Sequence, residues 1–222
     1  MEKEKMKSEI MSLFGTPVAA TNINRDFTED ELQFFLEDIP MKKYMEKYNE
    51  HKLLNHPHRS EDFCLFDNFT DILGNIKTFC EYHLKFYLEE LEGVDTNLAK
   101  LRITQSWLNK TKPQEFHHPH CHANSYLSGV LYISCLPNDG INFENPFRKY
   151  DNLEFMRERI TEWNSNITFM RVKEGDLIIF PSWIKHSVNI NETKDSERIS
   201  LSFNTFPVGK LGEYDSATLL EL

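Results

Sequence analysis

Cysteine is scarce in this chain of 222 residues, which has only Cys64, Cys80, Cys121 and Cys135. None of them forms a CxxC pair, and four are few for a disulfide framework in a chain of this size. We therefore expect reduced thiols, most of them buried. Cys121 lies between two histidines, and strand alternation predicts that it points away from them, so it is not counted as a metal ligand.

Long hydrophobic runs and an excess of positive charge are missing too. No run of about 18 apolar residues occurs and the opening MEKEKMKSEI is charged, so we expect neither a membrane partner nor a signal peptide. The formal net charge of −10 disfavours nucleic acid as a partner, because binding phosphates needs clustered Lys and Arg. A soluble cytoplasmic protein is expected, and the sequence leaves a homo-oligomer open.

The first 100 residues show mainly helical patterns and are expected to form a helical extension that packs on the rest. Thr28 and Glu31 make a capping-box pair before a helix that Pro40 ends, and a second short helix is expected over 41–52.

The strongest helical pattern covers residues 71–92. Its wide apolar stripe predicts packing against the outside of a sheet, and Gly93 can end the helix.

From Leu101 the apolar period changes to that of strands, so residues 101–207 are expected to form the core domain. We predict eight strands, the number that a jelly roll needs: 103–109, the histidine segment around 116–122, 128–134, 141–146, 167–172, 176–181, 186–191 and 199–206. Residues 149–166 read as an inserted helix or lid over the barrel mouth. The tail, 208–222, has little pattern.

Two histidines in the stretch FHHPHCHANSYLSGVLYIS are the first candidates for chemistry. His120 and His122 lie two residues apart on a segment that alternates like a strand, so their imidazoles are expected on one face. His186, beyond an apolar strand and a Pro-containing turn, is the candidate third donor. His118 and His120 form an alternative pair, but Pro119 lies inside it. Four other histidines, at positions 51, 56, 58 and 83, are expected on the surface or in helix packing.

A polar face on the last predicted strand is the second candidate. Arg198, Ser200, Ser202 and Asn204 share this face, and Ile199, Leu201 and Phe203 share the other. If the polar face looks towards the histidines it lines a cavity, in which a guanidinium suits a carboxylate.

These motifs together resemble a known family. The order HxH, GVLYIS, GINFENP, GDLIIFP, H and RISLSFN resembles the double-stranded β-helix of the iron(II)- and 2-oxoglutarate-dependent oxygenases. It is most similar to an uncharacterised group from bacterial and phage genomes. The pattern HxHxNSxLSGxxY is matched by His120, His122, Asn124, Ser125, Leu127, Ser128, Gly129 and Tyr132, and the pattern FPSWxxHxV by Phe180, Pro181, Ser182, Trp183, His186 and Val188.

The resemblance implies an α+β fold with a jelly-roll, cupin-like barrel, and three cofactors or cosubstrates: Fe(II), 2-oxoglutarate and O2. It implies His120, His122 and His186 as metal ligands and Arg198 as the partner of the far carboxylate of 2-oxoglutarate. Ser200, Tyr132 and Asn204 are the further candidates for the cosubstrate site. Trp107, Asn109 and Asn124 are expected to line the cavity.

Alternatives remain open for three of these residues. His122 stands where most relatives have Asp or Glu, and it is either the third ligand or a pocket residue beside a water that completes the site. Arg198 alone can also be a surface ion-pair residue, and Tyr132 a core residue.

The activity that the resemblance implies is hydroxylation of a substrate C–H bond with release of succinate and CO2. The substrate is a small molecule or a protein side chain. Two alternatives remain: a cupin-like three-histidine metalloenzyme of the thiol-dioxygenase type, and a non-catalytic metal- or ligand-binding jelly roll.

Overall fold

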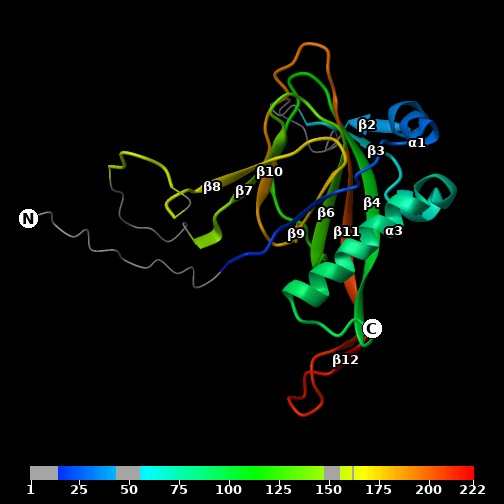
Figure 1. Ribbon diagram of the computed structural model, residues 1–222, viewed down its shortest axis with the longest axis vertical. Coiled ribbons are helices and arrows are strands. Elements are labelled where there is room, and N and C mark those ends of the chain that lie inside the picture. Colours follow the sequence, from blue (N-terminus) through cyan, green and yellow to red (C-terminus); the bar gives the residue numbers. More distant parts are fainter. Residues whose placement is uncertain (1–14, 44–55, 148–155, 162) are drawn as a thin grey trace, which may run out of the picture.

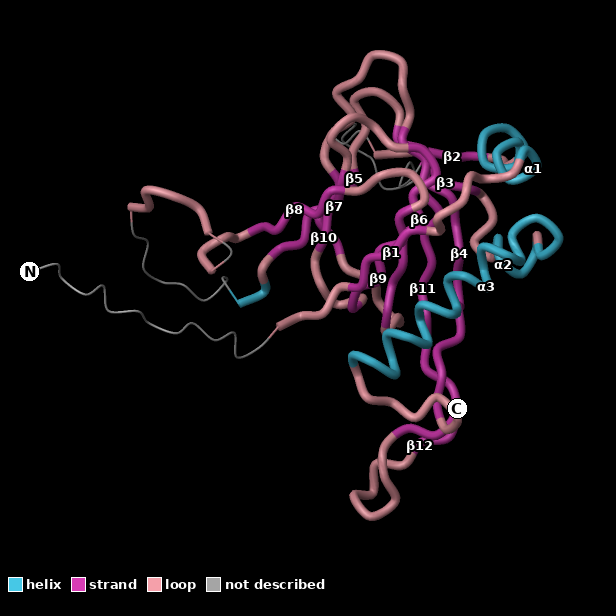
Figure 2. Tube along the Cα trace, viewed as in Figure 1, coloured by secondary structure: helices cyan, strands magenta, loops and turns pink. Residues whose placement is uncertain are grey.

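The computed structural model describes residues 15–43, 56–147, 156–161 and 163–222. Two antiparallel sheets dominate this part of the chain, and the helices cover one side of the larger sheet (Figure 1). The tube view shows the same arrangement, with strands of both sheets enclosing the interior (Figure 2). The predicted fold class, a jelly roll with helices on its outer face, is therefore confirmed.

The larger sheet has the strand order β1-β9-β6-β11-β4-β3-β2, with β12 paired to the end of β11. Its strands are β1 (Ala19–Asn22), β2 (Met41–Lys43), β3 (His58–Ser60), β4 (Ala99–Thr111), β6 (Leu127–Ser134), β9 (Asp176–Pro181), β11 (Arg198–Leu211) and β12 (Leu220–Glu221). The smaller sheet has the order β5-β10-β7-β8. It contains β5 (His117–His120), β7 (Gly140–Glu144), β8 (Ile167–Arg171) and β10 (His186–Val188). Each of the eight strands predicted after Leu101 is present.

Strand β11 lies in the middle of the larger sheet, between β6 and β4. Its apolar face, which carries Ile199, Leu201 and Phe203, is buried in the main core with the helices. The two-residue period of a strand then directs the alternate side chains into the space between the sheets. The sequence predicted this division between the two faces.

The helices form the other half of the main core. They are α1 (Glu29–Gln33), α2 (Leu65–Asn68) and α3 (Thr70–Phe86), with short π-helical turns η1 (Phe34–Asp38) and η3 (Tyr87–Leu91) continuing α1 and α3. Leu73, Ile76, Cys80 and Leu84 on α3 are buried against the sheet. Burial of each large apolar side chain stabilises the fold by roughly 1.5–3 kcal/mol.

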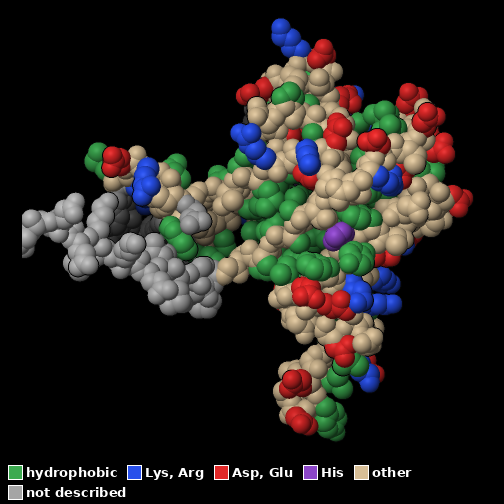
Figure 3. Space-filling view, viewed as in Figure 1, with side chains coloured by type: hydrophobic (Ala, Val, Ile, Leu, Met, Phe, Trp, Pro, Cys, Tyr) green, Lys and Arg blue, Asp and Glu red, His purple; other side chains and the backbone are tan. Residues whose placement is uncertain are grey.

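The predicted helix signals at both helices are also found. The capping box of Thr28 and Glu31 is complete, because each side chain accepts a hydrogen bond from the other residue's backbone N–H. Gly93 follows η3 with a φ of +66°, a left-handed conformation that favours glycine after a helix. Acidic side chains gather over α1, in keeping with the negative net charge (Figure 3).

The N-terminal region differs from the prediction in its strands. Strands β1, β2 and β3 extend the larger sheet, where we expected helices and loops. The expected second helix over 41–52 is wrong for Met41–Lys43, which pair with β3 in an antiparallel hairpin. Pro40 restricts the preceding residue, Ile39, to extended backbone, which ends η1 just before this hairpin. Residues 44–52 lie outside the described part.

The connection between β7 and β8 contains the expected insert, 149–166. Its described residues, 156–161 and 163–166, form turns and no helix. They lie away from the barrel (Figure 1) and do not line its cavity. The expected helix or lid is therefore wrong for these residues. Residues 149–155 and 162 lie outside the described part of the chain. The tail continues β11 to Leu211 and returns in β12.

The cysteines are free, as expected, but only Cys80 is fully buried. Cys64 and Cys121 are exposed and Cys135 is partly buried. In the described part of the chain no helix is long and apolar enough to cross a membrane.

Gly129 makes the closest contact between β6 and β11. A Cβ atom placed on it would lie 2.1 Å from Cζ of Phe203, a ring with no exposed surface. We expect Gly129→Ala to lower the free energy of unfolding by about 1–3 kcal/mol, because the buried ring must move. Thermal and urea unfolding measure this loss.

Two matched variants test the cause of that loss. Gly74→Ala on α3 adds the same methyl group where nothing lies within 4 Å, so it should stabilise the helix by about 0.5–1 kcal/mol. Phe203→Leu removes the ring that the methyl group would meet. An equal loss from Gly129→Ala in wild-type and Phe203→Leu backgrounds would contradict the steric explanation.

Candidate metal centre and active site

Three histidines converge between the two sheets. His120 ends β5 and His186 begins β10, and these neighbouring strands place the two residues directly opposite each other. His122 follows β5 in the next turn. One nitrogen from each ring lies within 4.8 Å of the others, and Nε2 of His122 is 3.2 Å from Nε2 of His186. This spacing suits three ligands of one ion.

Backbone carbonyls orient two of the rings in the same way. Nδ1–H of His120 donates to the oxygen of His118 at 2.8 Å, and Nδ1–H of His186 donates to the oxygen of Ile184 at 3.0 Å. Each Nε2 therefore keeps its lone pair for a ligand bond, which is the usual second-shell arrangement around a metal-bound histidine.

His122 is held differently. Its backbone N–H donates to the oxygen of Ser182 at 2.9 Å, and the indole of Trp107 stacks on its ring with centroids 5.8 Å apart. Because β5 ends at His120, the predicted strand does not extend to His122. Cys121 is exposed and is one of the residues that line the cavity, and it is not in the group of potential ligands.

Burial keeps these imidazoles neutral. Desolvation, followed by the charge of neighbouring His120, lowers the pKa of His186 to about 3 and that of His122 to about 4. Desolvation also lowers the pKa of His120. A metal competes with protons for these nitrogens, so neutral rings at physiological pH favour metal binding.

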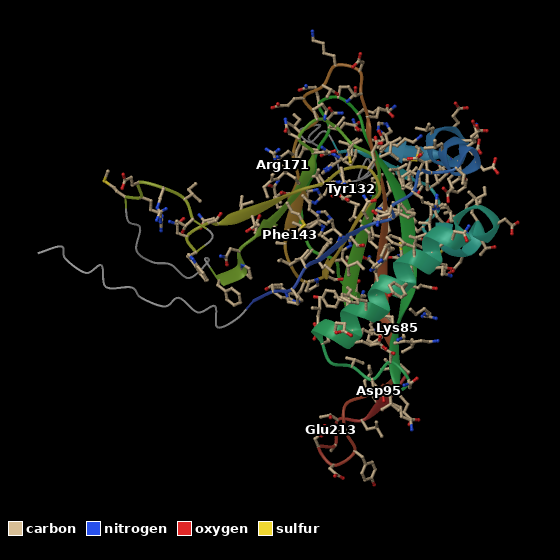
Figure 4. All side chains as sticks on the ribbon, viewed as in Figure 1. Lys85, Asp95, Tyr132, Phe143, Arg171 and Glu213 are labelled. Atoms are coloured by element: carbon tan, nitrogen blue, oxygen red, sulfur yellow. The ribbon has the colours of Figure 1, made fainter. Side chains whose placement is uncertain are left out.

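The histidines open into a cavity of about 440 Å³. Its lining includes the whole predicted polar face of β11 and three other residues that were candidates from the sequence. These residues are Trp107, Asn109, Tyr132, Arg198, Ser200, Ser202 and Asn204. Asn124 is exposed in a turn and does not line it. Figure 4 labels Tyr132 on β6 and Phe143 on β7, which pack in the apolar cluster between the sheets beside the cavity.

Arg198 makes a buried ion pair that the sequence did not predict. Its Nε–H donates to both carboxylate oxygens of Asp139, at 2.7 and 2.6 Å, and both side chains are almost fully buried. Nη1 of Arg198 is also buried but has no hydrogen-bond partner. A buried donor without a partner is costly, so this nitrogen suits an acceptor group on a ligand in the cavity.

No sequence pattern marks Asp139 as a partner of Arg198, because it precedes Arg198 by 59 residues. Its segment, LPNDG, reads only as a turn after a strand. Arg59 and Phe63 also line the cavity and were missed, since they belong to a region expected to be a helical extension.

The remaining histidines lie outside the three-histidine group. His56 is buried, with its ring 4.9 Å from that of His118, so the expected surface position is wrong for His56. His58 pairs with Glu115 at 3.1 Å, and His83 packs on Phe79 along α3. His51 lies outside the described residues.

Sequence comparison matches residues 105–204 to the family described as "Putative 2OG-Fe(II) oxygenase". The matched segment spans β4 to β11 and contains the three histidines and Arg198. Most of this barrel is therefore similar in sequence to the 2OG-Fe(II) oxygenases. The resemblance expected from the motifs is therefore confirmed at the level of the family. No curated protein sequence matches the chain.

Solved structures share this fold. The epimerase SnoN from nogalamycin biosynthesis, described as non-heme and alpha-ketoglutarate dependent, has a TM-score of 0.58 at 13% identity, over 87% of this chain and 81% of SnoN. HygX from Streptomyces hygroscopicus, with nickel, 2-oxoglutarate and hygromycin B bound, has a TM-score of 0.54 at 12% identity, over 86% of this chain and 82% of HygX.

The side chains of this site fit the metal and the cosubstrate named in the description of the matched family. Imidazole nitrogen is a good ligand for iron, and three of them converge here with oriented Nε2 atoms. The unpartnered guanidinium nitrogen in the same cavity fits a carboxylate oxygen.

The three-histidine centre is testable by metal binding alone. We expect His186→Ala to weaken Ni(II) or Fe(II) binding by at least about 100-fold, because one of three ligands is lost and second-shell changes alone cost 10–100-fold. Titration calorimetry under argon measures the affinity. His83→Ala, which removes an imidazole on α3, should leave it unchanged; equal affinities of all three proteins would rule out this centre.

Proposed function

We propose that this protein is an Fe(II)- and 2-oxoglutarate-dependent dioxygenase that hydroxylates a C–H bond of its substrate. One observation carries this proposal: the three converging imidazoles and the buried Arg198 line the same cavity. The family match supports the same reaction class. The fold alone does not decide for hydroxylation, since SnoN, with a similar fold, is described as an epimerase.

In this proposal His120, His122 and His186 hold the metal through Nε2. Arg198 binds the far carboxylate of 2-oxoglutarate through its unpartnered Nη1. Ser200 lies two residues from Arg198 on β11 and opposes Tyr132 on β6, and both line the cavity, which supports hydrogen bonds from their hydroxyls to that carboxylate. Asn204 lies at the other end of this face, close to the ring of His122.

The cavity runs along the strands and therefore has two ends. Arg198 opposes Thr111 on β4 at one end, and Asn204 opposes Gln105 at the other, six residues along β11 and so roughly 20 Å away. His122 and its stacked Trp107 lie towards the Gln105 end. We assign the Arg198 end to 2-oxoglutarate and the end with Gln105, Trp107 and Phe63 to the substrate.

When bound, iron(II) and 2-oxoglutarate supply the oxidation: dioxygen is consumed, one oxygen atom enters succinate as CO2 leaves, and the other enters the substrate C–H bond. The protein's own part is orientation and exclusion of water. Ile141 on β7 and Val188 on β10, from the smaller sheet, and Phe180 on β9 add apolar side chains to the lining of the cavity. A dry pocket strengthens the charge interactions made by Arg198 and protects the reaction from solvent.

A thiol-dioxygenase-type enzyme and a non-catalytic jelly roll predict a different result in one assay. With Fe(II), ascorbate and air, this protein should convert 2-oxoglutarate to succinate, even without its substrate, at a slow uncoupled rate. Proton NMR measures the succinate. Absence of succinate from iron-loaded protein would reject the proposed reaction.

Arg198→Lys tests the cosubstrate site within this assay. Lysine keeps a positive charge beside Asp139 but loses the forked guanidinium donors. We expect the KM for 2-oxoglutarate to rise by roughly 10–100-fold, the value of one or two charge-assisted hydrogen bonds. Arg102→Lys, on the exposed face of β4, is the control. An unchanged KM in Arg198→Lys would reject Arg198 as the carboxylate partner.

A further inference from the structure

Asp139 is buried at the end of the cavity that holds Arg198. Only 1% of its side chain is exposed, and it receives four hydrogen bonds. Two come from Nε–H of Arg198. The other two come from the backbone N–H groups of Leu136, at 3.1 Å, and Gly140, at 2.9 Å. A carboxylate with this set of donors is held as an anion at a fixed position.

The turn between β6 and β7 is built to hold this carboxylate. The backbone N–H of Asp139 donates to the oxygen of Leu136, and Asn138 adopts a left-handed φ of +59°. Asp139 is therefore joined at once to its own turn and to the first residue of β11. The hydrogen bonds from Nε–H of Arg198 to Asp139 hold the guanidinium in position and leave Nη1 of Arg198 for the ligand.

A charge count gives Asp139 a second role. In the common site, two histidines and one carboxylate hold iron(II). In that site the metal carries two positive charges and the arginine that binds the cosubstrate carries one. The ligand carboxylate carries one negative charge and 2-oxoglutarate carries two, so the sum is zero. This chain has His122 in place of the ligand carboxylate, so one negative charge is missing at the metal. The buried pair of Arg198 and Asp139 is neutral, which removes one positive charge and restores the balance.

We propose that Asp139, beside Arg198, supplies the negative charge that is missing at the metal because His122 replaces a carboxylate ligand. Building on the proposed function, this makes Asp139 a positioning and charge-compensating residue for 2-oxoglutarate. Arg59 also lines the cavity, and its charge is the same in every variant compared below. For charges on the order of 10 Å apart at an effective dielectric constant of about 20, one unit of charge changes a binding constant by roughly tenfold.

The first test is made at position 122 and leaves Asp139 in place. His122→Asp restores the common ligand set but adds one negative charge to a balanced cavity, and His122→Asn is its neutral isostere. We expect Ni(II)-saturated His122→Asp to bind 2-oxoglutarate about tenfold more weakly than Ni(II)-saturated His122→Asn, although aspartate is the better metal ligand. Titration calorimetry with 2-oxoglutarate measures both affinities without turnover, after metal content is checked.

Equal affinities, or tighter binding by His122→Asp, would overturn this inference and leave the proposed function intact. Failure of Ni(II)-loaded wild-type protein to bind 2-oxoglutarate would instead reject the proposed function itself. The two failures are therefore distinguishable.

The second test measures the effect of Asp139→Asn on Ni(II) affinity in the absence of 2-oxoglutarate. The orientation of Arg198 does not enter this measurement, because Arg198 is not a metal ligand in the proposed site. Removing one negative charge should weaken Ni(II) binding by at least about tenfold. Glu174→Gln is the matched control, because Glu174 is an exposed carboxylate near Cys135 with no contact to Arg198. It should leave the Ni(II) affinity unchanged.

Equal Ni(II) affinities of wild-type and Asp139→Asn protein would overturn the inference, as would an equal loss in Glu174→Gln. Thermal melting shows whether each variant is folded. If Asp139→Asn does not fold, the first test still applies, because equal 2-oxoglutarate affinities of the two position-122 variants would overturn the inference.

Discussion

The structure depends on one strand that separates two environments. On β11, side chains with odd numbers from Ile199 to Phe203 close the core against the helices, and those with even numbers line the cavity. A shift of one residue in its pairing with β4 or β6 would exchange these faces, placing polar groups in the core and apolar groups in the site. Stability and chemistry are therefore fixed by the same register.

The histidines depend on the smaller sheet in a comparable way. The pairing of β5 with β10 sets His120 opposite His186, and the backbone carbonyls of His118 in β5 and of Ile184, just before β10, orient both rings. His122 lies beyond the strand and relies on a stacked indole and on Ser182 for its position. Of the three histidines, His122 thus has the least support from regular backbone structure. Substitutions at position 122 are therefore expected to have little effect on the barrel.

Much of this could be predicted from local pattern, and the misses share a cause. The eight strands after Leu101, the two faces of β11 and the helix α3 all follow from apolar periods within short segments. The position of Asp139 beside Arg198 depends on contacts between distant segments, as does the packing of His56 on His118. Strands β1, β2 and β3 are three or four residues long, too short for a period to show, and tertiary pairing with β4 and β9 creates them.

The turn that holds Asp139 extends the influence of the site to a residue that never faces the cavity. A Cβ atom on Gly140 would lie 2.3 Å from the oxygen of Met170 and 2.5 Å from the ring of Phe169 on β8. Any side chain there would push β7 away from β8 and pull the neighbouring carboxylate from the guanidinium. In the proposed site, a substitution of Gly140 can therefore alter cosubstrate affinity while every residue that touches the ligand stays the same.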